Sequence, residues 1–213
     1  MKDISGRVGG VLAWHPEVAM SAPEIDEFLS GRWVARLATV GTDGYPHVCP
    51  FWYYWDGECV YLSATRTRGS YRDLAANPRC SVLIDMDDRP LMGIRSNMAK
   101  AVLITGDAQM EHVGSGRKVS IGAGPWRGEY PPERAVALVT SRYLLFARDG
   151  ALGTTGERFV EMLSSAETHG SQLMQDNQNR VFVKIRPKRI RAWDFSKAPI
   201  GVTSERAQRA VHD

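Results

Sequence analysis

The sequence predicts a mainly β protein of the α+β class, built from antiparallel strands that are joined by tight turns. Two Asp-Gly pairs, at 43–44 and 56–57, separate runs of apolar, aromatic and β-branched residues. Asp-Gly between such runs is a strong hairpin signal, because the turns that fit the twist of two antiparallel strands need residues that accept a positive φ. The runs predict three consecutive antiparallel strands over residues 33–40, 46–55 and 58–63.

Length and composition limit the function classes. The chain has 213 residues, which suits one domain, and its net charge of +3 is too mild for a nucleic-acid-binding surface. No apolar run reaches the roughly 18 residues of a membrane helix, and the N-terminus lacks a signal-peptide pattern. The three cysteines, Cys49, Cys59 and Cys80, fall in predicted strands, and their odd number favours free thiols in a reducing compartment. We therefore expect a cytoplasmic protein with neither a membrane nor a nucleic-acid partner.

The first predicted helix and the second predicted strand carry local signals. The helix begins after Ser21, because Ser21, Pro23 and Glu24 form the pattern of a capped first turn. In the run 46–55 both alternating faces are apolar or aromatic. The protein core must cover one face, and a partner subunit or a ligand must cover the other. Pro50 cannot donate to a strand ladder, so it predicts a bulge or an unpaired stretch close to a ligand.

The remaining elements follow from periodicity, glycine and proline. They are a helix over 70–76, strands over 80–86 and 100–110, a mobile loop over 111–132, helical segments over 133–147 and 156–174, and strands over 181–185 and 189–195 that are broken at Pro187. Gly106 lies inside a predicted strand and indicates a bulge or a close approach to a ligand. Trp126 and Tyr130 are candidate lid residues over a substrate mouth, and a plain surface loop is the alternative.

The polar segment 65–70 lies between a predicted strand end and a predicted helix start. A helix N-terminus offers unpaired N–H groups and partial positive charge, which suit an anion. Arg66 and Arg68 add charge-assisted donors of the kind that bind phosphate. The alternative is a solvated connector in which Ser70 or Thr67 caps the helix. The segment lacks the Walker pattern, so a nucleoside-triphosphate loop of that type is not predicted.

Several segments in order carry a resemblance to a known family. They are ARLATVGTDGYPHV at 35–48, the turn at Trp55-Asp56-Gly57, the loop at 65–70, Asn77-Pro78-Arg79, the strand that ends in Gly106-Asp107-Ala108, and RAWDF at 191–195. This order resembles the flavin split-barrel superfamily, which contains the pyridoxamine 5′-phosphate oxidases, and within it most closely the flavin- and deazaflavin (F420)-dependent oxidoreductases of actinobacteria. The resemblance implies a six-stranded antiparallel Greek-key split β-barrel with flanking helices. It also implies a homodimer with two cofactors in the grooves between its subunits.

The resemblance also implies where the cofactor binds. Its ring lies beside the strand 46–55 and its phosphate lies at the loop. The implied cofactor-binding residues are His47, Val48, Cys49, Pro50, Phe51, Trp52, Ser63, Thr65, Arg66, Thr67, Arg68, Gly69, Ser70 and Arg72. Many relatives carry a lysine near the position of Ser70, so the sequence departs from the family pattern there. The candidates for the catalytic proton donor are His47, Tyr53, Tyr54 and solvent, and the sequence does not favour one of them. The alternative to a catalytic role for His47 is that of an ordinary barrel histidine. The alternative to a chemical role for Cys49 is that its side chain only packs in the fold.

The implied function is an oxidoreductase that transfers hydride to or from a small organic substrate. Coenzyme F420 is the favoured cofactor, because its acidic tail would match Arg66, Arg68, Arg72 and Arg79, and FMN is the other candidate. The alternative function is a non-catalytic flavin, deazaflavin or haem protein that acts in binding, storage or sensing. No metal site is expected. The expected organisation is an arm over 1–20, a split-barrel domain over 21–197 with an insertion at about 111–178, and a tail over 198–213.

Overall fold

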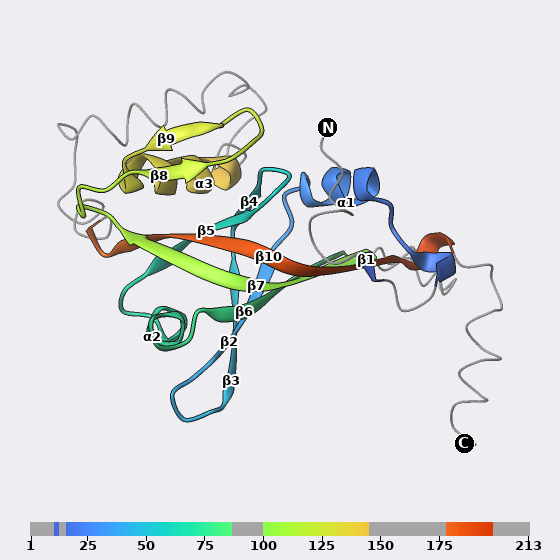
Figure 1. Ribbon diagram of the computed structural model, residues 1–213, viewed down its shortest axis with the longest axis horizontal. Helices are drawn as coiled ribbons and strands as arrows, with labels where there is room; N and C mark the ends of the chain where they lie inside the picture. Colours follow the sequence, from blue (N-terminus) through green and yellow to red (C-terminus); the bar gives the residue numbers. More distant parts are fainter. Residues whose placement is uncertain (1–10, 13–15, 87–99, 145–177, 198–213) are drawn as a thin grey trace.

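The computed structural model describes residues 11–12, 16–86, 100–144 and 178–197 (Figure 1). Its main sheet consists of β1 (Val11–Leu12), β2 (Ala35–Val40), β3 (Pro46–Phe51), β4 (Tyr53–Trp55), β5 (Val60–Thr65), β6 (Arg79–Met86), β7 (Lys100–His112) and β10 (Arg180–Asp194). A small second sheet pairs β8 (Val119–Ile121) with β9 (Gly128–Tyr130). The helices are α1 (Ala22–Leu29), α2 (Gly69–Ala76) and α3 (Pro132–Leu144), with short 3-10 helices at Pro16–Val18 and Phe195–Lys197.

The main sheet is antiparallel apart from the short β1. Its strand order is β3-β2-β6-β7-β10-β5-β4, and β1 runs parallel to β10. The sheet curls into a half-barrel (Figure 1), and a hydrophobic core fills its inside. The mainly β fold class that the sequence predicted is therefore confirmed. The described part of the sheet has eight strands where six were expected, because β1 joins it and because one predicted strand divides into two.

That division corrects the second predicted strand. Residues 46–55 do not form one strand: β3 pairs with β2, whereas β4 pairs with β5, and these two hairpins lie at opposite ends of the strand order. The chain changes partner at Trp52, which lies between the two strands. Pro50 is not the interruption, since it pairs in register with Arg36. An edge strand such as β3 tolerates proline because one of its sides needs no N–H donors.

The two predicted C-terminal strands are one strand in the structure. β10 runs through Pro187 and shows only a register shift between Pro187 and Arg189. Gly106 of β7 pairs with Pro187, and a Cβ at Gly106 would lie 2.1 Å from the carbonyl oxygen of Arg186. The close approach predicted at this glycine is therefore to the neighbouring strand rather than to a ligand, and only glycine fits there.

The segment 111–132 is also more ordered than predicted. It contains the β8–β9 hairpin, and Trp126 packs on Tyr54 with ring centroids 4.4 Å apart. The hydroxyl of Tyr130 donates to the carbonyl oxygen of Trp126 at 3.0 Å. Both aromatic residues are partly buried and pack against the cluster formed with α3, and Trp126 also lines a cavity described below. The helical segment predicted over 156–174 lies outside the described residues.

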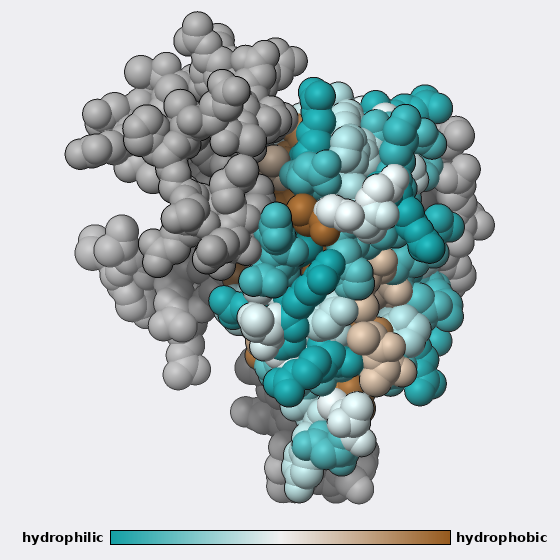
Figure 2. Space-filling model, turned by 90° about the vertical axis from the view of Figure 1, so that its left-hand side faces the viewer, coloured by the Kyte–Doolittle hydropathy of each residue, from teal (hydrophilic) through white to brown (hydrophobic). Residues whose placement is uncertain are grey.

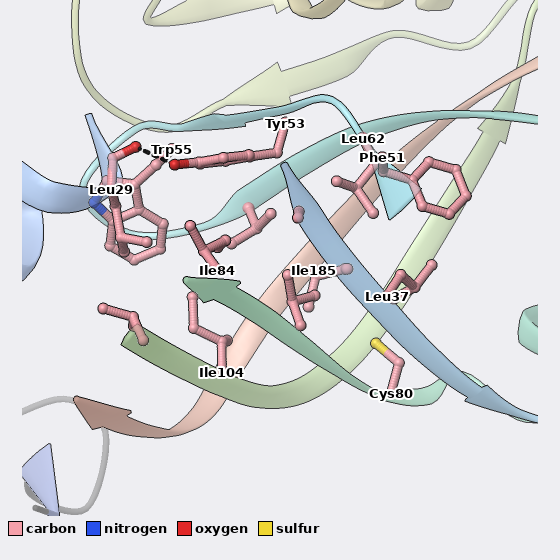
Figure 3. Close-up of a cluster of buried hydrophobic side chains, with 14 of the residues drawn as sticks. Leu29, Leu37, Phe51, Tyr53, Trp55, Leu62, Cys80, Ile84, Ile104 and Ile185 are labelled. Atoms are coloured by element: carbon pink, nitrogen blue, oxygen red, sulfur yellow. Dashed lines mark hydrogen bonds between the residues drawn. The ribbon is translucent and has the colours of Figure 1, made fainter. Parts of the chain in front are cut away.

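Two hydrophobic clusters hold the fold. The larger fills the inside of the curled sheet beneath α1, and Figure 3 shows Leu37, Ile84, Ile104 and Ile185 converging there from four strands. The smaller lies between α3 and the outer side of β4, β5 and β10. Within the described ranges, no helix combines the length and the apolar composition that a membrane crossing requires.

Candidate functional site

The loop between β5 and α2 is tightly turned and exposed. The N–H of Arg68 donates to the carbonyl oxygen of Thr65 at 3.0 Å, and the N–H of Arg66 donates to that of Asn179 at 2.9 Å. The side chains of Arg66, Thr67 and Arg68 lie in solvent. This backbone anchoring fixes the loop while it leaves two guanidinium groups available to a ligand.

The first turn of α2 has no side-chain cap. Arg68 is the residue before the helix, and its extended backbone carries no capping hydrogen bond from its side chain. The alternative in which Ser70 or Thr67 caps the helix is therefore not found. The Ser70 hydroxyl is fully buried and has no hydrogen-bond partner among the described residues. An uncapped helix start suits an anionic group, because the first N–H groups of a helix have no partner within the helix.

A groove of about 530 Å³ joins this loop to the end of β3. Seven of the expected cofactor-binding residues line it: Pro50, Phe51, Trp52, Ser63, Thr65, Thr67 and Arg68. They come from two regions of the sequence that the curled sheet brings together. The groove is apolar and aromatic at the β3 side and cationic and hydroxyl-rich at the loop side. This division matches a ligand with a flat ring system at one end and an anion at the other.

Five lining residues were missed by the sequence analysis. They are Val34, Ala64, Val139, Thr140 and Arg180. Arg180 stands opposite Thr65 where β10 pairs with β5, and its guanidinium donates to the Ser63 hydroxyl at 3.4 Å. Only strand pairing brings Arg180 to the loop, so no local motif identifies it. Val139 and Thr140 come from α3, which lies within the helical segment predicted over 133–147.

The other seven expected residues do not line this groove: His47, Val48, Cys49, Arg66, Gly69, Ser70 and Arg72. Val48 points out of the half-barrel and is 59% exposed. Gly69 starts α2 directly over His47, since a Cβ there would lie 3.0 Å from the imidazole Cε1. Arg66 and Arg72 are exposed, Arg66 in the loop itself and Arg72 in the first turn of α2. Figure 2 views the molecule from the left-hand side of Figure 1, and the described residues that are visible there are mostly hydrophilic.

His47 belongs to a chain of polar contacts beneath α2. Its Nδ1 lies 3.0 Å from Asp73 Oδ2, and its Nε2 lies 3.0 Å from the sulfur of Cys49. Asp73 is buried and also accepts a 2.7 Å hydrogen bond from the Thr39 hydroxyl. That hydrogen bond, followed by the one from His47, lowers the pKa of Asp73 below its usual value. Asp73 is therefore a carboxylate near neutral pH.

The two tyrosines that were considered as proton donors lie in the packed interior. Tyr53 is fully buried, and its hydroxyl donates to the carbonyl oxygen of Leu29 at 2.9 Å (Figure 3). Burial raises the pKa of Tyr53 far above its usual value and that of Tyr54 to about 12. Neither is among the described residues that line the groove. His47 does not line the groove either, but its side chain is 39% exposed, so His47 and solvent stay the candidate proton donors.

A second, larger cavity of about 1240 Å³ lies at the turn between β4 and β5. Its wall includes Asp56, whose carboxylate accepts the Tyr61 hydroxyl at 2.7 Å and the N–H of Gly122 at 3.0 Å. These bonds attach the loop before β9 to the main sheet. The lining mixes carboxylates with arginines and a lysine, so the cavity shows no single charge preference.

Comparisons with known proteins agree with this architecture. A family model described as pyridoxamine 5′-phosphate oxidase matches residues 21–194. The conserved hypothetical protein Rv2991 from Mycobacterium tuberculosis is similar in structure, with a TM-score of 0.58 and 24% sequence identity over 89% of this chain and 98% of that chain. An F420 reductase matches with a TM-score of 0.45 and 20% identity over 78% of this chain and 94% of that chain. The haem storage protein HutZ from Vibrio cholerae matches with a TM-score of 0.47 and 19% identity over 79% and 91%.

No curated protein matches the sequence. The family model nevertheless covers both sides of the groove, from α1 to the end of β10. The chain therefore belongs to the pyridoxamine 5′-phosphate oxidase family and has its curled antiparallel β fold.

Proposed function

We propose that this protein is an oxidoreductase that binds coenzyme F420, or FMN as the second choice, and transfers hydride to or from a small organic substrate. The observation that carries the proposal is the groove, in which an aromatic wall meets a cationic loop at an uncapped helix start. Family membership supports a flavin-like ligand at this place. When bound, the cofactor supplies the redox chemistry, and the protein binds and orients it.

The residues of the groove fit the two ends of such a cofactor. Arg68 and Arg180 bring positive charge to the loop side, and Thr65 and Thr67 add hydroxyl groups. Charge-assisted hydrogen bonds from guanidinium groups are the strong kind that hold phosphate. On the other side, the half-exposed indole of Trp52 offers a flat apolar surface to a ring.

F420 is preferred because of the cations outside the groove. Arg66 and Arg72 are exposed next to the loop, and neither side chain lines the groove itself. FMN ends at its phosphate and would leave them unused. The acidic tail of F420 continues beyond the phosphate, and carboxylates there would pair with these two arginines.

A homodimer is part of the proposal. The β2–β3 hairpin exposes an apolar face, in which Val40 is 42%, Val48 59% and Trp52 44% exposed. β3 is also an edge strand of the described sheet. Exposed apolar surface of this kind marks an interaction site. A second copy of the chain would bury this face and complete the cofactor groove. We also propose a cytoplasmic location, in line with three unpaired cysteines.

A second function is favoured by one observation. The described lining of the groove contains no histidine, cysteine, aspartate or glutamate, and so no acid or base at the usual pH. A binding, storage or sensing protein for flavin or deazaflavin needs none, whereas a haem protein would need an axial ligand from outside this described lining. Hydride transfer remains compatible with this lining if solvent or His47 supplies the proton.

The absorption spectrum of the purified full-length protein distinguishes these candidates. Flavin bands would identify FMN, a deazaflavin band at shorter wavelength would identify F420, and a Soret band would identify haem. Mass spectrometry of the released ligand supplies the assignment. Rapid oxidation of the reduced, bound cofactor by enones or quinones would support the enzyme, whereas slow oxidation by all acceptors would favour the binding protein. A haem spectrum would overturn the main proposal.

A further inference from the structure

A polar chain of four residues runs from Thr39 through Asp73 and His47 to Cys49. The three heavy-atom separations are 2.7 Å from hydroxyl to carboxylate, 3.0 Å from carboxylate to imidazole Nδ1 and 3.0 Å from imidazole Nε2 to sulfur. β2 supplies Thr39, β3 supplies His47 and Cys49, and α2 supplies Asp73. The arrangement joins a nucleophile, a base and a group that orients the base.

The carboxylate fixes the protons along this chain. Because Asp73 is ionised, it can only accept hydrogen bonds, so the hydrogen on the imidazole lies on Nδ1. The Nε2 of a neutral His47 then carries a lone pair that faces the Cys49 thiol. The S–H donates to this nitrogen, and Nε2 is placed to take the proton when the sulfur reacts.

Access separates Cys49 from the other two cysteines. Cys59 and Cys80 are buried, at 9% and 5% exposure, whereas Cys49 is partly exposed. Burial raises the pKa of the Cys80 thiol to about 12 and also raises that of Cys59. Among the three thiols, Cys49 alone combines an imidazole partner with solvent access.

We propose that Cys49 is a nucleophilic thiol that adds to soft carbon electrophiles, namely alkenes conjugated to a carbonyl group. His47 acts as its base, and Asp73 acts as the positioning residue. The sulfur forms a bond to the β-carbon while the alkene π bond breaks. The thiol proton moves to His47 Nε2 and then to the α-carbon of the adduct, so the addition consumes no other reactant.

The place of Cys49 in the chain suits this substrate class. Cys49 packs against apolar side chains of the main core, and Phe51, two residues further along the same face of β3, lines the groove, so the surroundings of the thiol are apolar and suit an alkene. Gly69 leaves room for the imidazole, because any side chain at that position would meet the ring. The inference does not depend on the identity of the cofactor or on hydride transfer.

Alkylation by acrylamide tests the proposal on the full-length protein at neutral pH, with the modified cysteine mapped by mass spectrometry. We expect Cys49 to react at least tenfold faster than glutathione under the same conditions. His47→Ala should reduce this rate by about 100-fold, as expected for loss of a general base. Added imidazole should restore much of it, since it can occupy the space left under Gly69; a merely structural role for His47 would give no such rescue.

Two more variants complete the test. Asp73→Asn should also slow the alkylation, but added imidazole should not restore it because the His47 ring still fills its site. His112→Ala serves as the matched histidine control and should leave the rate unchanged, since the imidazole of His112 contacts the Tyr71 hydroxyl and none of the four residues of the polar chain. If Cys49 in the unaltered protein reacts no faster than glutathione, or if His47→Ala keeps its rate, the proposal is wrong. The alkylation rate of Cys49 in the unaltered protein, compared with that of glutathione, tests the proposal even if a variant fails to fold.

Discussion

The indole of Trp52 and the phenol of Tyr143 stack with their ring centroids 5.2 Å apart and their planes within 3° of each other. Trp52 lies where the chain passes from the β2–β3 hairpin to the β4–β5 hairpin, so this contact attaches that point to α3. The Tyr143 hydroxyl also accepts the N–H of Tyr53 at 3.2 Å and lies 3.0 Å from the carbonyl oxygen of Trp33. One side chain from α3 thus supports the wall of the groove and the start of β4.

Tyr143→Phe should lower the free energy of unfolding by about 1–3 kcal/mol, because it leaves the partly buried N–H of Tyr53 without an acceptor while it keeps the ring stack. Urea unfolding followed by fluorescence measures the change. Tyr45→Phe is the control, since Tyr45 is 75% exposed, and it should change stability by less than about 0.5 kcal/mol. Equal stability of the Tyr143→Phe protein would mean that this hydroxyl is not a structural acceptor.

Val48→Glu should convert the proposed dimer to a monomer. Val48 is 59% exposed on the β2–β3 hairpin, and a carboxylate buried at the centre of an apolar interface is costly. Light scattering coupled to size-exclusion chromatography measures the mass. Glu129→Lys, on the exposed side of β9, is the control and should leave the assembly unchanged. A monomeric unaltered protein, or a Val48→Glu protein that is still dimeric, would exclude this face as the interface.

Glu24 should make the fold sensitive to acid. Hydrogen bonds from Lys197 first, and then from Ser21, lower the pKa of Glu24 from its ordinary 4.5 to about 2. Between these pH values Glu24 binds more protons in the unfolded chain than in the folded one. The contribution of Glu24 to the stability of the fold is therefore full above pH 4.5 and disappears as the pH falls towards 2.

Glu24→Gln should therefore reduce the loss of stability between neutral pH and pH 3, as measured by urea unfolding at each pH. The exposed Glu27 on the same helix provides the control, and Glu27→Gln should retain the acid sensitivity of the unaltered protein. An unchanged slope in Glu24→Gln would show that the Lys197 contact does not form in solution.

Local signals predicted much of the fold correctly. Both Asp-Gly turns join paired strands, and the α2 helix begins at Gly69 within one residue of the prediction. The errors concern pairing between distant segments. Pro50 was interpreted as an interruption because the sequence does not reveal that β3 is an edge strand, and Pro187 was interpreted as a break because a register shift in β10 has no local signature.

The candidate site shows the same limit. The loop with Arg68 was recognised because its residues are contiguous, and its partners Phe51 and Trp52 followed from the family resemblance. Arg180 was missed because 112 residues separate it from Arg68 in the numbering, and only the pairing of Arg180 with Thr65 brings the two arginines together. The contact of Cys49 with His47 was not expected either, since it depends on Asp73 and α2 to hold the ring.

The affinity of the full-length protein for F420 and FMN, measured by fluorescence titration, tests the central claim most directly. The Arg66→Ala/Arg68→Ala double variant should bind the preferred cofactor at least about tenfold more weakly, since charge-assisted hydrogen bonds contribute about 1.5–3 kcal/mol each. Arg68→Ala alone should account for most of the loss, because of the two substituted arginines only Arg68 lines the groove. Arg117→Ala, which removes an exposed arginine paired with Glu111, should bind normally. Equal affinity of the double variant and the unaltered protein would contradict the assignment of this loop as the anion site.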